Sequence, residues 1–268
     1  MNNILKGLVM LISLVSLAGC SLQDKLLYYP SRDLPSQEEL ATGNMEFWPV
    51  PGALYRGFVS KTGSTVLKGT VIVFHGNAGT AADRIFYVHA LAPLGYRVIL
   101  AEYPGYGARG GALGEISFVR DAAETIRLAF EQDLGPVFLL GESLGCGVAA
   151  ALARECPEKI AGIILVTPWD SLLSVASAKF PFLPVKPLLK DRYDNSENLQ
   201  GFSGKIAVVG AERDEIIPLK HARKLYESLP AGKKLWIVKG AGHNDWPLLV
   251  GVHQWQEFMD YVATKDNR

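Results

Sequence analysis

The chain has 268 residues, and its 27 basic residues (Lys and Arg) balance its 27 acidic residues (Asp and Glu). This balance excludes a typical nucleic-acid-binding domain, because such domains gain most of their affinity from clustered Lys and Arg. With 49% hydrophobic and 20% charged residues, the chain is also too apolar to be largely disordered. A chain of this length buries enough surface to fold without a disulfide scaffold, so we expect one α/β domain.

The start of the chain, residues 1–19, has the pattern of a secretory signal peptide. Lys6 is followed by an apolar run over residues 7–18. This run is shorter than the roughly 20 apolar residues of a spanning helix, so we expect it to be cleaved off. Two kinds of signal peptide fit this pattern: a lipoprotein signal peptide, or an ordinary one whose removal leaves a soluble protein.

Cys20 follows Leu17, Ala18 and Gly19, and this stretch resembles the lipobox of bacterial lipoproteins. The resemblance implies that Cys20 becomes the new N-terminus and carries lipid, which makes the membrane a partner of the protein. Ser21 fits sorting to the outer membrane of a diderm bacterium. We therefore expect a lipidated tether over residues 20–41, a location in the bacterial cell envelope, and a folded domain over residues 42–268.

The other two cysteines are Cys146 and Cys156. If both lie on the one helix predicted in this region, ten residues separate them by about 15 Å. A disulfide tolerates only about 7 Å between Cα atoms, so both thiols are expected to stay unpaired and buried.

Short apolar runs alternate with helical patterns along the predicted domain. Because the runs lack strict alternation, they are typical of strands buried on both faces of a parallel sheet. The alternation predicts an α/β protein with a mostly parallel, doubly wound sheet. The expected strands are 46–50, 53–59, 70–74, 97–102, 137–140, 160–166, 205–209 and 234–238, and the expected helices are 81–94, 115–132, 144–155, 221–228 and 247–265.

One segment, residues 168–204, departs from this rhythm. It contains Phe180-Pro181-Phe182-Leu183-Pro184 and Pro187, and prolines this frequent prevent one long helix. An insertion at the C-terminal edge of a parallel sheet lies where ligands usually bind, so we interpret it as a short lid.

The sequence Gly141-Glu142-Ser143-Leu144-Gly145 lies between a predicted strand and a predicted helix. A serine on so tight a turn stands exposed at the sheet edge, while the glycines leave room for the backbone and the helix. This context makes Ser143 a candidate nucleophile.

A serine hydroxyl needs a base to take its proton, and the chain has five histidines. His89 and His253 fall inside predicted helices and His221 opens one, so these three are assigned to packing or solvent. His75 ends an early strand. His243 follows the last strand, at the sheet edge that presents the serine, and is the predicted base.

The imidazole needs a carboxylate to fix its tautomer. Asp214 follows the strand over 205–209 and gives the chain order Ser, Asp, His that is expected for this arrangement. Asp170, one strand earlier, is the competing candidate.

The developing oxyanion needs preorganised N–H donors. We expect one from the backbone of Leu144 and the other from Asn77, with Ala78 as the alternative. Asn77 lies in a glycine-rich turn that lacks the Lys-Ser/Thr of a phosphate-binding P-loop.

Taken together, these motifs resemble the α/β-hydrolase superfamily and, within it, the BEM46-like, ABHD12/13/17-related serine hydrolases. The resemblance implies hydrolysis of ester, thioester or amide bonds through an acyl-enzyme, without metal or organic cofactor. One departure is Ala211, where relatives commonly have glycine. The motifs are His75-Gly76-Asn77-Ala78-Gly79, Tyr103-Pro104-Gly105-Tyr106-Gly107, the Ser143 turn, Asp214 with Pro218, and Gly242-His243-Asn244-Asp245, preceded by Tyr28-Tyr29-Pro30.

The expected function is therefore that of a serine esterase or thioesterase acting on a small-molecule or lipid-like acyl substrate. A serine peptidase of the aminopeptidase or prolyl type and a non-catalytic envelope lipoprotein that retains the fold are the alternatives. The lid residues Phe180, Phe182 and Leu183, with Trp169, are expected either to bind an acyl chain or to cover the core.

Overall fold

A computed structural model of the chain describes residues 23–49, 55–61, 67–132 and 135–264. The expected signal peptide and Cys20 lie outside the described residues. Within the described ranges, no helix is long and apolar enough to cross a membrane.

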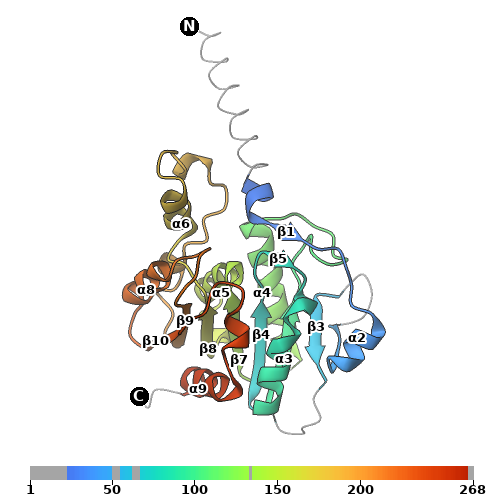
Figure 1. Cartoon of the computed structure of the whole chain (residues 1–268). Coiled ribbons are helices and arrows are strands. Elements are labelled where there is room, and N and C mark those ends of the chain that lie inside the picture. Colours follow the sequence, from blue (N-terminus) through green and yellow to red (C-terminus); the bar gives the residue numbers. More distant parts are fainter. Residues whose placement is uncertain (1–22, 50–54, 62–66, 133–134, 265–268) are drawn as a thin grey trace.

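In the described part of the chain, the central sheet has the strand order β10-β9-β8-β7-β4-β6-β3-β2 (Figure 1). The strands from β10 to β6 pair in parallel, and β3 and β2 continue the sheet antiparallel at one edge. The predicted mostly parallel α/β sheet is thus confirmed. The strands are β2 (Met45–Trp48), β3 (Gly57–Ser60), β4 (Gly69–Phe74), β6 (Tyr96–Ala101), β7 (Val137–Glu142), β8 (Gly162–Val166), β9 (Lys205–Ala211) and β10 (Lys233–Val238).

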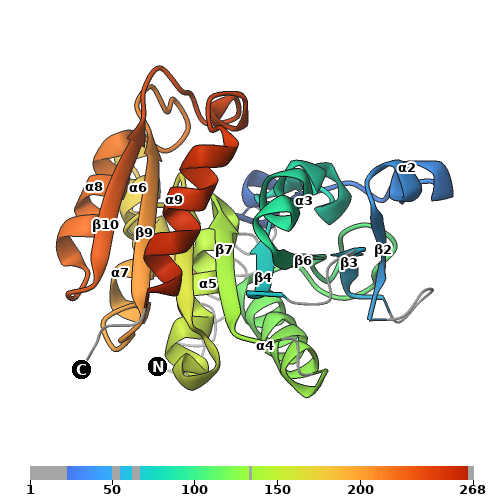
Figure 2. The ribbon, with the colours of Figure 1, turned by 90° about the horizontal axis from the view of Figure 1, so that it is seen from below.

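Helices cover both faces of this sheet. Figure 2 shows α3 (Ile85–Leu91) and α9 (Val252–Ala263) on one face, with α4 (Glu115–Glu131), α5 (Leu144–Glu155) and α8 (Leu219–Ser228) on the other. Neighbouring residues of one strand serve opposite cores, because successive side chains of a strand point to opposite faces. In β4, Ile72 packs in the α4–α5 core and Val73 in the α3–α9 core. Both are buried, which explains the unbroken apolar run.

Two predicted helices are broken into shorter pieces. The segment 81–94 consists of two single 3-10 turns, Ala81–Arg84 and Ala92–Leu94, on either side of α3. The predicted helix over residues 247–265 consists of a 3-10 turn, Trp246–Leu248, followed by α9. Pro93 and Pro247 lie in the turns Ala92–Leu94 and Trp246–Leu248, where an unbroken α-helix is disfavoured because proline lacks the N–H that an α-helix interior requires.

The segment expected to be a free tether instead packs on the domain from Gln23 onward. Residues 23–27 are helical, β1 (Tyr29–Pro30) pairs in parallel with β5 (Ala78–Gly79), and α2 (Gln37–Thr42) follows. The expected boundary at residue 42 therefore does not separate a loose segment from the folded unit.

The predicted lid contains α6 (Leu172–Lys179), a 3-10 turn at Lys186–Leu188 and the short α7 (Asn195–Asn198). Figure 1 shows α6 at the same end of the molecule as the start of the described chain. Trp169 at the base of the lid is buried, whereas Phe182 is 96% exposed. The aromatic residues of the lid tip therefore do not cover the core.

Candidate active site

Ser143 lies between the end of β7 and the first residue of α5. Its φ of 51° lies in the left-handed region, which costs energy for a residue with a side chain. The neighbouring glycines permit this turn. A Cβ on Gly145 would lie 1.9 Å from the carbonyl oxygen of Phe74, and one on Gly141 would lie 2.6 Å from Cα of Cys146. The backbone is therefore packed too tightly here for any other residue.

The structure brings the predicted nucleophile, base and acid together. The Nε2 atom of His243 lies 3.0 Å from the Ser143 hydroxyl oxygen, and its Nδ1 atom lies 2.7 Å from Oδ2 of Asp214. All three residues are at most 8% exposed. The proton on the serine thus has an acceptor within hydrogen-bond distance, and the imidazole is oriented by a carboxylate.

Asp214 is fixed by its own loop. Its Oδ1 accepts hydrogen bonds from the backbone N–H groups of Ile216 (3.0 Å) and Ile217 (2.7 Å), which leaves Oδ2 to face His243.

Asp170, the competing acid, is paired elsewhere. Its Oδ1 lies 2.7 Å from Nδ1 of His221, and its Oδ2 lies 2.7 Å from Nζ of Lys224. Burial alone raises the pKa of Asp170, but the hydrogen bonds from Lys224 and His221 outweigh it and hold the pKa below its ordinary value. The structure thus favours Asp214 as the partner of the base.

His221 belongs to this second carboxylate–imidazole pair, which the sequence did not indicate. It is buried, as expected for packing, and its Nε2 atom has no hydrogen-bond partner among the described residues. A histidine in the first turn of α8 gives no sequence signal for a partner on the loop after β8.

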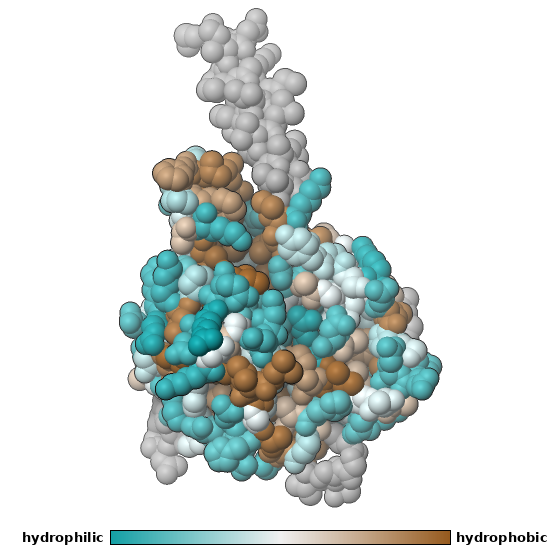
Figure 3. Space-filling model, in the orientation of Figure 1, coloured by the Kyte–Doolittle hydropathy of each residue, from teal (hydrophilic) through white to brown (hydrophobic). Residues whose placement is uncertain are grey.

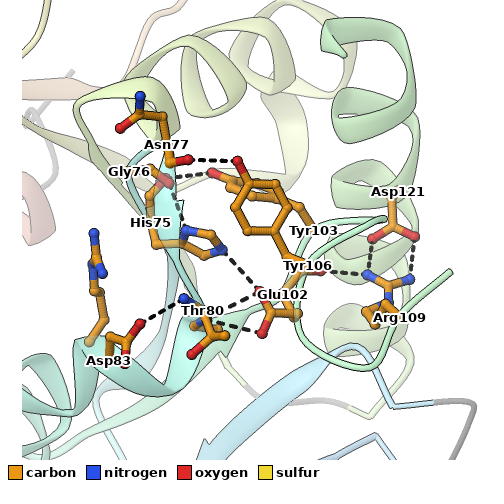
Figure 4. Close-up of polar contacts among 12 residues, drawn as sticks. His75, Gly76, Asn77, Thr80, Asp83, Glu102, Tyr103, Tyr106, Arg109 and Asp121 are labelled. Atoms are coloured by element: carbon orange, nitrogen blue, oxygen red, sulfur yellow. Dashed lines mark hydrogen bonds and ion pairs between the residues drawn. The ribbon is translucent and has the colours of Figure 1, made fainter. Parts of the chain in front are cut away.

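The loop expected to supply the second oxyanion donor lies beside Ser143. A Cβ on Gly76 would lie 3.8 Å from Cβ of Ser143. The buried side chain of His75 stabilises this loop. Its Nδ1 atom lies 2.7 Å from the carbonyl oxygen of Gly76, and its Nε2 atom lies 3.1 Å from Oε1 of Glu102 (Figure 4). His75 is thus buried beneath the loop and is not available as a base.

Asn77 forms hydrogen bonds through both its backbone carbonyl and its side chain. Its carbonyl oxygen accepts from the Tyr106 hydroxyl (2.7 Å) and from the backbone N–H of Tyr29 (2.9 Å). Its Nδ2 donates to the carbonyl of Leu27 (2.8 Å). The side chain is therefore directed to the N-terminal segment, which leaves the backbone N–H as the group relevant to an oxyanion.

Glu142, the residue before the nucleophile, forms a partly buried ion pair. Its Oε1 accepts from Nη2 of Arg84 (2.9 Å), and its Oε2 accepts from the hydroxyl of Tyr87 (3.1 Å). These contacts link the nucleophile turn to the helix after the Gly76 loop. The motif alone gave no reason to expect Arg84 or Tyr87 here.

Both described cysteines are free. Cys146 is buried and its thiol lies 3.1 Å from the carbonyl oxygen of Gly141, while Cys156 is only half-buried, contrary to expectation. Burial raises the pKa of Cys146, and raises that of Cys156 to about 11. Neither is a reactive thiolate at neutral pH. No cluster of potential metal ligands occurs among the described residues.

A serine on a strand–turn–helix, followed along the chain by an acid and a histidine at the same edge of a parallel sheet, defines the class of α/β hydrolases. The family model described as "Serine aminopeptidase, S33" matches residues 65–194. An uncharacterized protein of Mycobacterium tuberculosis is 31% identical over 242 residues, which cover 86% of this chain and 84% of that protein. The chain belongs to the α/β-hydrolase family.

Two further kinds of relative agree with this assignment. Bovine lysophosphatidylserine lipase ABHD12 is 28% identical over 175 residues, covering 58% of this chain but only 44% of the bovine protein. Among solved structures, an esterase of Pyrococcus furiosus shares the fold with a TM-score of 0.67 at 17% identity, covering 89% of this chain and 99% of that one. The monoacylglycerol lipase of Paleococcus ferrophilus gives 0.57 at 22% identity, covering 75% and 96%.

Proposed function

We propose that this chain is a serine hydrolase that cleaves ester or thioester bonds through an acyl-enzyme. The observation that carries the proposal is the hydrogen-bonded path from Ser143 through His243 to Asp214, with distances of 3.0 Å and 2.7 Å. A chain that only binds a ligand has no need of a strained serine next to an oriented imidazole.

In the first half of the reaction, the Ser143 hydroxyl oxygen bonds to the substrate carbonyl carbon while Nε2 of His243 takes its proton. The carbonyl oxygen becomes an oxyanion, which the backbone N–H groups of Leu144 and Asn77 stabilise. His243, stabilised as imidazolium by Asp214, then donates the proton to the leaving alcohol or thiol. This step leaves the acyl group on the serine.

In the second half, a water molecule attacks the acyl carbon. His243 takes a proton from this water and returns it to the Ser143 oxygen as the acid is released. No step needs a metal or an organic cofactor.

A lipid-like acyl substrate is the class that we propose. Two observations support it: one relative is named a lysophosphatidylserine lipase, and a solved neighbour is a monoacylglycerol lipase. The description of the family model instead favours an aminopeptidase. A chain-length series of p-nitrophenyl esters, compared with aminoacyl arylamides, separates the two. Efficient arylamide cleavage with negligible ester turnover would favour the peptidase.

The catalytic proposal is tested with a fluorophosphonate probe, which reacts covalently with activated serines. The wild-type protein should label, Ser143→Ala should not, and Ser117→Ala, a matched change in α4, should label like the wild type. If folded wild-type protein fails to label, the chain is a non-catalytic member of its family.

We also propose that Cys20 carries lipid and anchors the protein to a membrane of the bacterial cell envelope. The lipobox-like sequence before Cys20 supports this. Cells grown with an alkyne analogue of palmitate should incorporate it into the wild-type chain and not into Cys20→Ala. Equal incorporation in both would refute the lipid site.

A further inference from the structure

The tip of the lid, residues 180–188, exposes apolar side chains close together. Phe182 is 96% exposed, Leu183 56%, Phe180 40% and Leu188 38%. Single exposed apolar residues are common on proteins, but a cluster of them marks a surface that meets another apolar phase. The cluster lies outside the hydrogen-bonded site around Ser143.

Within residues 179–192, the exposed charged side chains are all basic. They belong to Lys179, Lys186, Lys190 and Arg192, of which Lys190 pairs with Asp24 of the N-terminal segment (3.6 Å). The one acidic residue of this stretch, Asp191, is buried and accepts hydrogen bonds from the side chains of the N-terminal segment. The lid tip therefore combines aromatic and aliphatic residues with a positive rim, the composition of a segment that lies in a membrane interface.

The described chain begins at the base of the lid. The side chain of Gln23 accepts from the backbone N–H of Lys190 (2.6 Å) and donates to Asp191 (2.9 Å). Cys20 lies three residues earlier, a separation of at most about 11 Å along an extended chain. The proposed lipid site is thus joined along the chain to the base of the lid, where Gln23 contacts Lys190 and Asp191.

Figure 3 shows brown, apolar residues on the lid at the end of the molecule where the described chain begins. Leu26, in the helical turn at the start of the described chain, is 57% exposed. If the N-terminal segment is attached to a bilayer, the lid tip at the same end of the molecule therefore lies close to that bilayer.

We propose that the lid tip docks on an anionic lipid surface, with Phe182 and Leu183 inserted among the acyl chains and Lys179 and Lys186 at the headgroups. A second copy of the chain fits this surface less well, because two positive rims would face each other. The docking does not depend on the catalytic proposal. It places the lid, whose base follows β8 at the edge that holds Ser143, against the membrane.

Fluorescence of a single position tests this docking. A polarity-sensitive fluorescent amino acid replaces Phe182 in the full chain, and the same residue replaces Phe130 in a control. Phe130 is 50% exposed and lies near the C-terminal end of α4. The N-terminal end of α4 is the one that contacts the lid, because the backbone N–H of Glu115 donates to Asp191. Unchanged thermal unfolding verifies that both proteins are folded.

On vesicles of equal parts phosphatidylcholine and phosphatidylglycerol, emission at position 182 should shift to the blue. It should also lose quenching by aqueous iodide and gain quenching by spin-labelled acyl chains, with no change at position 130. Unchanged iodide quenching at 182 would overturn the proposal. So would a blue shift that grows with protein concentration without vesicles, since a second copy would then cover the tip.

The charge of the rim gives a second, quantitative readout. Neutralising one lysine, as in Lys186→Gln, should shift the equilibrium between docked and free lid about fivefold toward free, because each lysine near an anionic surface contributes about 1 kcal/mol. On vesicles of phosphatidylcholine alone, the wild type and Lys186→Gln should behave alike. A docking signal that is equal on both kinds of vesicle would contradict the proposed role of the lysines.

Discussion

The hydroxyl of Tyr28 donates a 2.7 Å hydrogen bond to Oδ2 of Asp191, a residue 163 positions away in the sequence. Both are buried, and the same hydroxyl lies 3.0 Å from that of Tyr193. Burial and the nearby Asp191 carboxylate raise the pKa of Tyr28, so the group remains a donor. Through this contact the N-terminal segment, which also binds Asn77, is joined to the lid.

Tyr28→Phe should lower the free energy of unfolding by about 1–3 kcal/mol, because the change leaves a buried carboxylate oxygen with one donor fewer. Urea unfolding measures this loss. The matched control is Tyr29→Phe, since Tyr29 is 52% exposed and its hydroxyl bonds only a nearby backbone carbonyl. Equal losses in the two variants would contradict the structural role of Tyr28.

Asp214→Asn and Asp170→Asn should differ in activity. Asp214→Asn loses the carboxylate that orients His243, and kcat should fall by about 10⁴. Asp170→Asn should retain most of its kcat, because Asp170 pairs with His221 and Lys224 instead. Initial rates on p-nitrophenyl butyrate distinguish the two, and a larger loss for Asp170→Asn would reverse the assignment.

The pH dependence of stability should reveal the pairing of Asp170. Its pKa in the folded protein is lowered, so its ionised form stabilises the fold above its ordinary value near 3.8. That contribution is lost as the pH falls through the lower, folded-state pKa. The difference in unfolding free energy between the wild type and Asp170→Asn should therefore shrink as the pH falls below about 4. A difference that grows on acidification would have the wrong sign.

Gly145→Ala should destabilise the protein by about 3 kcal/mol or prevent folding, because the added Cβ would lie 1.9 Å from the Phe74 carbonyl oxygen. Gly201→Ala, where nothing lies within 4 Å of the added atom, should leave the melting temperature nearly unchanged. Calorimetry of the two variants measures the contrast. A Gly145→Ala protein as stable as Gly201→Ala would refute the close approach of the nucleophile turn to β4.

Local patterns were sufficient for most of the sheet and for naming Ser143 and His243 as candidate catalytic residues. The apolar runs predicted β4 and β6 to within two residues, since strands buried on both faces are built mostly of apolar residues. The glycines around Ser143 are a local requirement of the turn, so they are visible in the sequence. The prolines at 93 and 247 were visible too, but their effect on helix type depends on packing.

Contacts between segments that are distant in the sequence could not be predicted from local patterns. The pairing of Asp170 with His221 and the bond from Tyr28 to Asp191 arise from positions that only the folded chain brings together. No periodicity marks such pairs, because each depends on two loops that end at one sheet edge. The choice between Asp214 and Asp170 needed this geometry.

The sequence by itself therefore determined the class of fold, the order of strands and helices along the chain, and the candidate serine and histidine, since turn chemistry and buried apolar runs are local. The tertiary structure decided which carboxylate faces His243, that the N-terminal segment packs against the Asn77 loop, and that the lid tip exposes its aromatic residues. Those outcomes depend on which surfaces the chain brings into contact when it folds, and a linear pattern does not contain that information.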